Sequence, residues 1–271
     1  MDSASRDIDG RFRKKRRRER IERRVYFLAS FALLMVIWET CRAVGLINPQ
    51  LFPSIAAVAQ SCIAQLRDGS LQQHMYASFL RVLVSFSIGI LLAVFFGFLI
   101  GWFRVVRMLV DPGINFFRAL PPIALIPLMI IFFGIGETSK IIVLSYASFF
   151  PALVVIYQAL VSLDPIYIRA ARALGATNME MFRKIILPQL VPHIITACRV
   201  SLGVCWATLV AAELIAAQRG IGAMMVEAQN FFQMPPLVLG IILIGVISLV
   251  MDAFVRLIER RATQWQEKMT N

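Results

Sequence analysis

Residues 169–188 read Arg-Ala-Ala-Arg-Ala-Leu-Gly-Ala-Thr-Asn-Met-Glu-Met-Phe-Arg-Lys-Ile-Ile-Leu-Pro, a polar segment between two long apolar stretches. Just before it, Asp164 can cap the amino end of a helix. Pro165 suits the first turn of that helix, where no backbone donor is needed. Gly175 lacks a Cβ and therefore suits the left-handed residue that closes a helix. The pattern predicts a first short helix over 166–174.

A second short helix follows the glycine. Thr177 and Glu180 have the spacing of a capping box, which starts a helix over 181–187. Pro188 either ends that helix or joins it to the next apolar stretch. Alanines give the first helix a low relief that lets another surface come close, and basic side chains supply charge: Arg169, Arg172, Arg183 and Lys184. The segment suits a docking surface for another protein; the alternative is an amphipathic connector lying on the membrane.

The chain around this segment is a polytopic membrane protein. Of its 271 residues, 59% are hydrophobic and only 16% are charged. A soluble domain of this size could not bury that much apolar surface. Six apolar stretches are long enough to cross about 30 Å of hydrocarbon. We place these predicted spans at 25–46, 82–102, 119–134, 141–161, 191–217 and 237–258.

Charge sets the predicted topology. Of the 28 Lys and Arg residues, 21 fall in segments assigned to the cytosol and four in segments assigned outside. Both termini are therefore expected inside: a basic tail at 1–24, a six-span transmembrane domain at 25–258 and a second tail at 259–271. The basic run between Arg11 and Arg24 could also suggest nucleic acid or a signal peptide, but it adjoins a retained first span. Outside, a short helix is expected around 55–66, beginning at Ser54.

The spacing of the polar segment resembles a known family. Ala170-Ala171, three residues, Gly175, nine residues, Ile185, one residue and Leu187-Pro188 match the cytoplasmic loop of bacterial ABC importer permeases. That pattern begins with Glu, where this chain has Arg169, so any salt bridge made by the Glu is in doubt. Runs starting at Arg118, Phe133 and Leu209, the last with Gly220-Ile-Gly222, resemble the taurine, aliphatic sulfonate and nitrate branch.

The resemblance implies a fold and a set of partners. The fold is the type I ABC importer permease, an all-α protein of six transmembrane helices with a cytoplasmic coupling helix in the segment 164–188. The implied importer has two permease chains, two cytosolic ATPases and an extracytosolic binding protein. Closure of the ATPases would pass through the coupling helix and rock the spans between inward and outward openings. A homodimer in the bacterial inner membrane is expected.

Four ionisable residues are candidates for the solute pathway. Charges inside spans are costly unless they pair or face a cavity, which singles out Glu39, Arg199 and Glu213. Arg199 would attract an anionic solute, and Glu213 would belong to a gate near the outer mouth; Arg118 could act as Arg199 does. Arg199 and Glu213 are about 21 Å apart on one helix and cannot pair directly. The alternative is that each pairs with another span.

Other chemistry is not indicated. No Gly-Lys-Ser/Thr phosphate-loop ending occurs, so energy must come from a partner ATPase or an ion gradient. His74 and His193 are too few for a zinc centre, no cofactor is expected, and the four cysteines suit packing. An ion-driven transporter using Glu39 and Glu213 as proton sites is the second hypothesis. A taurine-like sulfonate is the favoured solute, followed by nitrate or bicarbonate, and cofactor precursors remain open.

Overall fold

The computed structural model describes residues 51–216 and 218–262, with 22, 25–26, 29–30, 32–33, 35–41 and 44 before them. Two compact units are present, residues 1–61 and 62–271. In the first, the Glu39 carboxylate accepts a hydrogen bond from the Ile55 backbone N–H at 3.0 Å. Helix α2 (Ile55–Arg67) starts there, and this confirms the short helix predicted around 55–66. Much of the predicted span 25–46 and almost all of the tail 1–24 lie outside the described residues.

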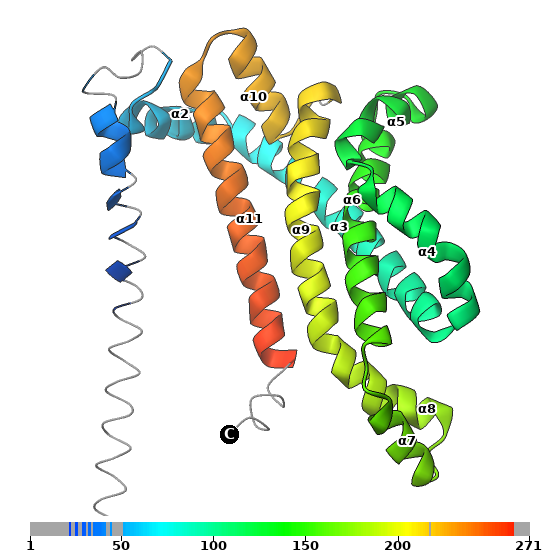
Figure 1. Cartoon of the computed structure of the whole chain (residues 1–271). Coiled ribbons are helices and arrows are strands. Elements are labelled where there is room, and N and C mark those ends of the chain that lie inside the picture. Colours follow the sequence, from blue (N-terminus) through cyan, green and yellow to red (C-terminus); the bar gives the residue numbers. More distant parts are fainter. Residues whose placement is uncertain are drawn as a thin grey trace, which may run out of the picture. The chain divides into compact units, whose positions relative to one another are not determined.

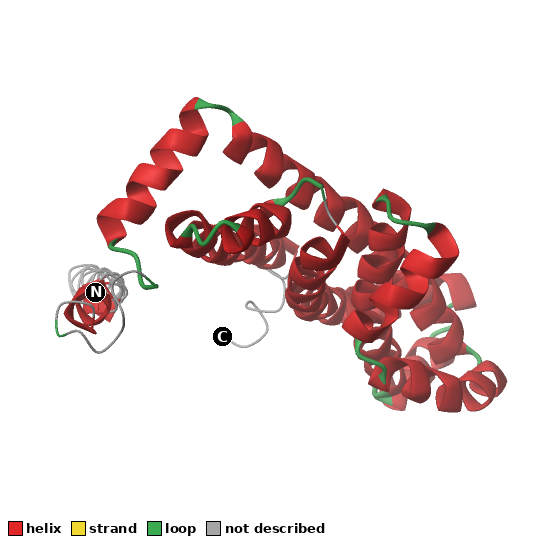
Figure 2. Cartoon of the chain, turned by 90° about the horizontal axis from the view of Figure 1, so that it is seen from above, coloured by secondary structure: helices red, strands yellow, loops and turns green. Residues whose placement is uncertain are grey.

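Helices also make up the second unit, joined by turns and loops in the described residues (Figure 2). In chain order they are α3 (Ser70–Trp102), α4 (Arg104–Ala119), the 3₁₀ turn η1 (Pro122–Leu125), α5 (Ile126–Phe133), α6 (Glu137–Val161), α7 (Pro165–Ala173), α8 (Asn178–Met181), the π-helical turn η2 (Phe182–Ile186), α9 (Leu187–Ala216), α10 (Ile221–Asn230) and α11 (Met234–Ala262).

The core lies where α6 packs between α3 and α9. Figure 1 shows α9 running between α11 and α6. Close approach of α3 and α6 depends on glycine: a Cβ on Gly89 would lie 2.7 Å from the Ser148 Cβ, and one on Gly97 would lie 2.7 Å from the Ile156 Cγ2. Small residues let backbones approach in this way in membranes, where packing stabilises helix pairs.

Four of the described helices are long and apolar enough to cross a membrane: α3, α6, α11, and α9 with the turns before it. They correspond to the predicted spans 82–102, 141–161, 191–217 and 237–258, but all four start earlier than predicted. α3 begins 12 residues early, at Ser70, because its first turns carry polar side chains that hydropathy excludes although they are compatible with a helix. The apolar stretches of the sequence therefore locate the spans but underestimate the length of the helices.

The third predicted span, 119–134, covers only the second arm, Pro122–Phe133, of a bent pair of helices. α4 ends at Ala119, and the pair of helices that meets there is bent by 88°. Pro121 and Pro122 explain the break, because proline lacks a backbone N–H and disfavours helical geometry in the residue before it. Leu120 is accordingly extended, with φ −74° and ψ 122°. The Tyr157 hydroxyl donates to Asp111 at 3.1 Å and ties α4 to α6.

Candidate functional site

The polar segment 164–188, which we call the coupling segment, has the predicted helix–Gly–helix structure. Its first helix, α7, is capped by Asp164, whose Oδ1 accepts from the Ile166 N–H at 2.8 Å. Gly175 closes it with φ +78°. The Gly175 and Ala176 N–H groups donate to the Arg172 and Ala171 carbonyls, both at 3.0 Å. These two bonds form the Schellman motif that glycine favours at a helix end.

The second half of the coupling segment begins with the predicted capping box. The Glu180 carboxylate accepts from the Thr177 N–H at 3.0 Å, and the Thr177 hydroxyl accepts from the Glu180 N–H at 3.3 Å. α8 has only four residues, and the π-helical turn η2 joins it to α9. Pro188 lies in the first turn of α9 and does not end a helix, so the second of the two predicted alternatives holds.

Exposure divides the residues of the coupling segment. Ala171 is buried, whereas Arg169, Ala170 and Gly175 are exposed; Ile185, Leu187 and Pro188 are half-buried, where the segment joins α9. The three other basic side chains are also exposed: Arg172, Arg183 and Lys184. In Figure 1 α7 and α8 lie together beyond the start of α9. The segment is therefore a small, rigid, basic surface anchored by its own hydrogen bonds.

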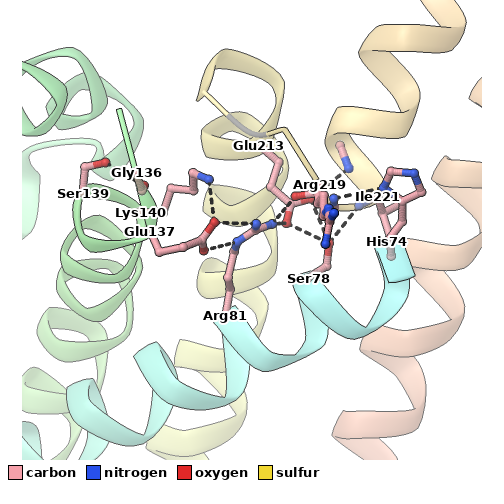
Figure 3. A network of polar contacts seen from close by, with 12 residues as sticks. His74, Ser78, Arg81, Gly136, Glu137, Ser139, Lys140, Glu213, Arg219 and Ile221 are labelled. Atoms are coloured by element: carbon pink, nitrogen blue, oxygen red, sulfur yellow. Dashed lines mark hydrogen bonds and ion pairs between the residues drawn. The ribbon is translucent and has the colours of Figure 1, made fainter. Parts of the chain in front are cut away.

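At the other end of α9 lies a group of charged side chains, Arg81, Glu137, Lys140 and Glu213, which we call the buried ion network (Figure 3). Arg81 projects from α3 and donates from Nη1 to Glu213 on α9 at 2.5 Å. Its Nε and Nη2 form a two-pronged contact with Glu137 on α6, at 2.6 and 2.7 Å. Lys140 reaches the same carboxylate at 3.0 Å. The network thus links α3, α6 and α9.

The Glu213 carboxylate is enclosed by the turn that leads to α10. Ser78 donates to it at 2.7 Å, and the Gly222 N–H donates at 2.9 Å. A Cβ on Gly222 would lie 2.6 Å from the Glu213 Cβ, and a Cβ on Gly220 would overlap the carboxylate itself. Gly220 also has φ +138°, which L side chains rarely adopt. The Gly-Ile-Gly sequence is therefore required by the position of the buried carboxylate.

A pocket of about 590 Å³ opens beside the buried ion network. Charged and polar groups line one part of it, and apolar residues of α3 and α6 line the rest. Its lining includes Arg81, Glu137, Lys140, Arg219, Tyr76 and Leu80. Among the residues that the structure describes, no group of three or more His, Cys, Asp or Glu side chains could hold a metal ion. The site's chemistry is that of fixed charges beside a small cavity.

The four pathway candidates have separate partners. Glu213 belongs to the buried ion network, and Glu39 caps α2. Arg199 is half-buried on α9 and pairs with Asp252 at 3.0 Å and Glu259 at 3.5 Å, both on α11. Arg118 is exposed at the end of α4, where it donates to Asn115 at 3.4 Å. The structure therefore places these residues at different positions along the helices.

Sequence reasoning did not single out most of the residues around Glu213. Arg81 and Lys140 are not among the predicted site residues, and neither is Asp252, the partner of Arg199. A usable signal existed: an acidic and a basic residue in different apolar stretches are each costly alone, so they are expected to pair. The choice among several partners was open, because Arg81 lies 56 positions from Glu137 and 132 positions from Glu213.

A bundle of apolar helices, with an exposed helix–glycine–helix segment at one end and buried ion pairs at the other, is the architecture of a multi-pass membrane protein. The chain belongs to the family described as the binding-protein-dependent transport system inner membrane component, which matches residues 87–264. It is thus the permease component of a binding-protein-dependent ABC importer and a multi-pass inner-membrane protein.

Two relatives cover nearly the whole chain. A probable ABC transporter permease protein of Brucella abortus (strain 2308) is 42% identical over 89% of this chain and 95% of its own. The taurine transport system permease protein TauC of Escherichia coli (strain K12) is 36% identical over 88% of each chain. At this coverage both similarities extend well beyond the coupling segment.

The fold also matches a solved structure. A crystal structure of an amino acid ABC transporter with histidines superposes with a TM-score of 0.60, over 74% of this chain and 97% of that chain, at 18% identity. This likeness establishes the type I ABC importer permease fold expected from the sequence.

Proposed function

We propose that this chain is the pore-forming subunit of an ATP-driven importer for a small aliphatic sulfonate such as taurine. The observation that carries this solute is the 36% identity with TauC over 88% of each chain. The lining of the pocket is compatible with an anion, because it contains Arg81, Lys140 and Arg219 but only one exposed carboxylate, that of Glu137. An extracytosolic binding protein would deliver the solute to this end of the molecule.

The coupling segment is the proposed docking surface for a separate cytosolic ATPase. Its caps fix the backbone, and its exposed arginines and lysine can meet acidic groups of a partner. The half-buried Ile185 and Leu187 would then transmit movement of the docked helix to α9. We assign this end, both termini and the basic tail to the cytosol. Each importer would contain two identical permease chains and two ATPases.

Co-purification and uptake test this function together. The tagged chain is extracted from native membranes in mild detergent, and associated proteins are identified by mass spectrometry. We expect a stoichiometric P-loop ATPase, and uptake of radiolabelled taurine that stops when the P-loop lysine of that ATPase is replaced. Recovery of the chain without an ATPase after crosslinking would contradict the proposal and favour an ion-driven carrier.

Competition assays then identify the solute class. Unlabelled alkanesulfonates should compete with labelled taurine in cells that express the complete system, whereas nitrate, bicarbonate and neutral cofactor precursors should not. Competition by nitrate alone would move the assignment to the nitrate branch. Because binding proteins set much of an importer's selectivity, the same compounds are tested for binding to the binding protein that is found to deliver solute to this chain.

A further inference from the structure

The buried ion network contains one carboxylate that differs from the rest. Arg81 and Lys140 have side chains that are only 7% and 5% exposed, yet the Glu137 carboxylate that joins them is 56% exposed. Each of its contacts runs toward a buried cation: two to the Arg81 fork and one to the Lys140 Nζ. Two buried cations therefore share a carboxylate that faces the pocket.

Glu213 provides the contrast within the same network. Its side chain is fully buried, and its oxygens accept from Ser78, from Arg81 and from the Gly222 N–H. The surrounding glycine turn leaves it no room to move. Glu137 has no such enclosure, because it is the first residue of α6 and follows Gly134 and Gly136. Its carboxylate can rotate into the pocket without breaking the turn that holds Glu213.

The position that the Glu137 carboxylate occupies is chemically an anion site. The Nε and Nη2 groups of Arg81 form a planar fork that matches two oxygens of a carboxylate or sulfonate. Lys140 supplies a third donor, and the positive end of the α6 dipole lies at the same place. The adjoining pocket of about 590 Å³ has room for the remainder of a small solute.

We infer that Glu137 is a displaceable internal anion, and that the anionic group of the transported solute takes its place between Arg81 and Lys140. This inference rests on the proposed function and names the subsite for the solute's sulfonate. Without Glu137 or a replacement, Lys140 would lose its carboxylate and Arg81 would keep only Glu213, which leaves buried positive charge uncompensated. Glu137 therefore swings away only when a solute anion arrives, and the link between α3 and α6 opens only with solute present.

Binding to the purified transporter tests the displacement directly. The full chain, with the subunits that co-purify, is placed in lipid nanodiscs without ATP and titrated calorimetrically with methanesulfonate. Glu137→Gln removes the competing charge and keeps the side-chain size, so methanesulfonate should bind at least about tenfold more tightly, the factor that 1.4 kcal/mol represents. Lys140→Met should weaken binding by a similar factor, and Lys140→Arg should restore it.

The matched control is Asp68→Asn. Asp68 is an exposed carboxylate in the turn between α2 and α3, and it accepts hydrogen bonds from Ser70 at 2.7 and 2.9 Å. It lies 13 residues before Arg81, about 20 Å along a helix. Its loss removes the same charge and should leave methanesulfonate affinity unchanged. Equal affinity of wild type and Glu137→Gln, or equal tightening by Asp68→Asn, would overturn the inference.

Folding and function are separated by further measurements. Size-exclusion profiles establish whether each variant is folded. If Glu137→Gln is not folded, Glu137→Asp replaces it and keeps the charge on a shorter side chain. The affinity of Glu137→Asp for methanesulfonate should then rise less than threefold, because the carboxylate still competes. If methanesulfonate binding follows the expected order but cells import no sulfonate, the solute assignment fails and the subsite stands. If cells import sulfonate but Glu137→Gln binds methanesulfonate as the wild type does, the solute assignment stands and the proposed subsite fails.

Discussion

The coupling segment and the buried ion network place charge in opposite environments. In the coupling segment, Lys184 and Glu180 pair across one helical turn with side chains that are 74% and 46% exposed. In the network, Arg81 and Glu213 are 132 positions apart and almost completely buried. Exposed pairs contribute little to stability, whereas breaking a buried pair leaves an uncompensated charge. The first region's charges are available to a partner, and the second region's charges hold helices together.

Glu213→Gln should have the largest effect on stability. It leaves the buried Arg81 guanidinium without one of its two carboxylates, at a cost of about 3–5 kcal/mol. Thermal unfolding of the purified chain in detergent, followed by intrinsic fluorescence, measures the loss. Glu180→Gln is the control, and its melting temperature should stay close to that of the wild type. Comparable destabilisation by both variants would remove the distinction between the two regions.

Gly222→Ala tests the enclosure of Glu213 without altering any charge. The added Cβ would lie 2.6 Å from the Glu213 Cβ, so the turn or the carboxylate must shift, at about 1–3 kcal/mol. Gly203→Ala in α9 is the matched control, because nothing lies within 4 Å of its added Cβ. That change should be neutral or stabilise the helix by about 0.5–1 kcal/mol. Equal losses would show that the glycine turn does not enclose the carboxylate.

Gly175→Val should separate transport from stability. Valine resists the φ of +78° at this position, which costs about 1–2 kcal/mol in a segment that contributes little to the core. We expect the chain to reach the membrane in normal amounts while ATP-driven uptake is lost. Gly175→Asn should keep activity, because asparagine tolerates the left-handed region. Normal uptake by Gly175→Val would exclude the proposed coupling role.

Arg199→Gln should have the smallest effect on folding, below about 1 kcal/mol, because its ion pairs are partly exposed. If Arg199 attracts the solute, labelled-taurine uptake should weaken while ATPase co-purification stays intact. Asp252→Asn is the comparison: it breaks the same ion pair but keeps the cation and should preserve uptake. Unchanged uptake by Arg199→Gln at several solute concentrations would remove this residue from the pathway.

The two regions also differ in how well the sequence predicts them. The coupling segment depends on neighbours in the chain: Asp164 with Ile166, Thr177 with Glu180, and a glycine at the helix end. Each has a short spacing that a single sequence displays, so caps and closing residue were predicted correctly. The role proposed for the segment stays a prediction, because backbone geometry does not identify a partner.

The buried ion network could not be predicted in the same way. Glu213 was recognised as an unusual charge, and the Gly220-Ile-Gly222 run as a feature of the resembling branch, but their contact was not. Burial of Arg81 depends on the register in which α3 packs on α9, which no local spacing encodes. The bend at Pro121 shows the same limit. The apolar run of 119–134 predicts a span, but it does not predict the angle of 88° between that segment and α4.

The unbroken connection between the two regions has a mechanical consequence. α9 has 30 residues, begins where the coupling segment ends and carries Glu213 in its last turn. It rises about 45 Å, so a pivot of only about 5° at one end displaces the other by about 4 Å. That displacement exceeds the length of a hydrogen bond. A small tilt of α9 that starts at the coupling segment is therefore enough to make or break ion pairs at the opposite end of the helix.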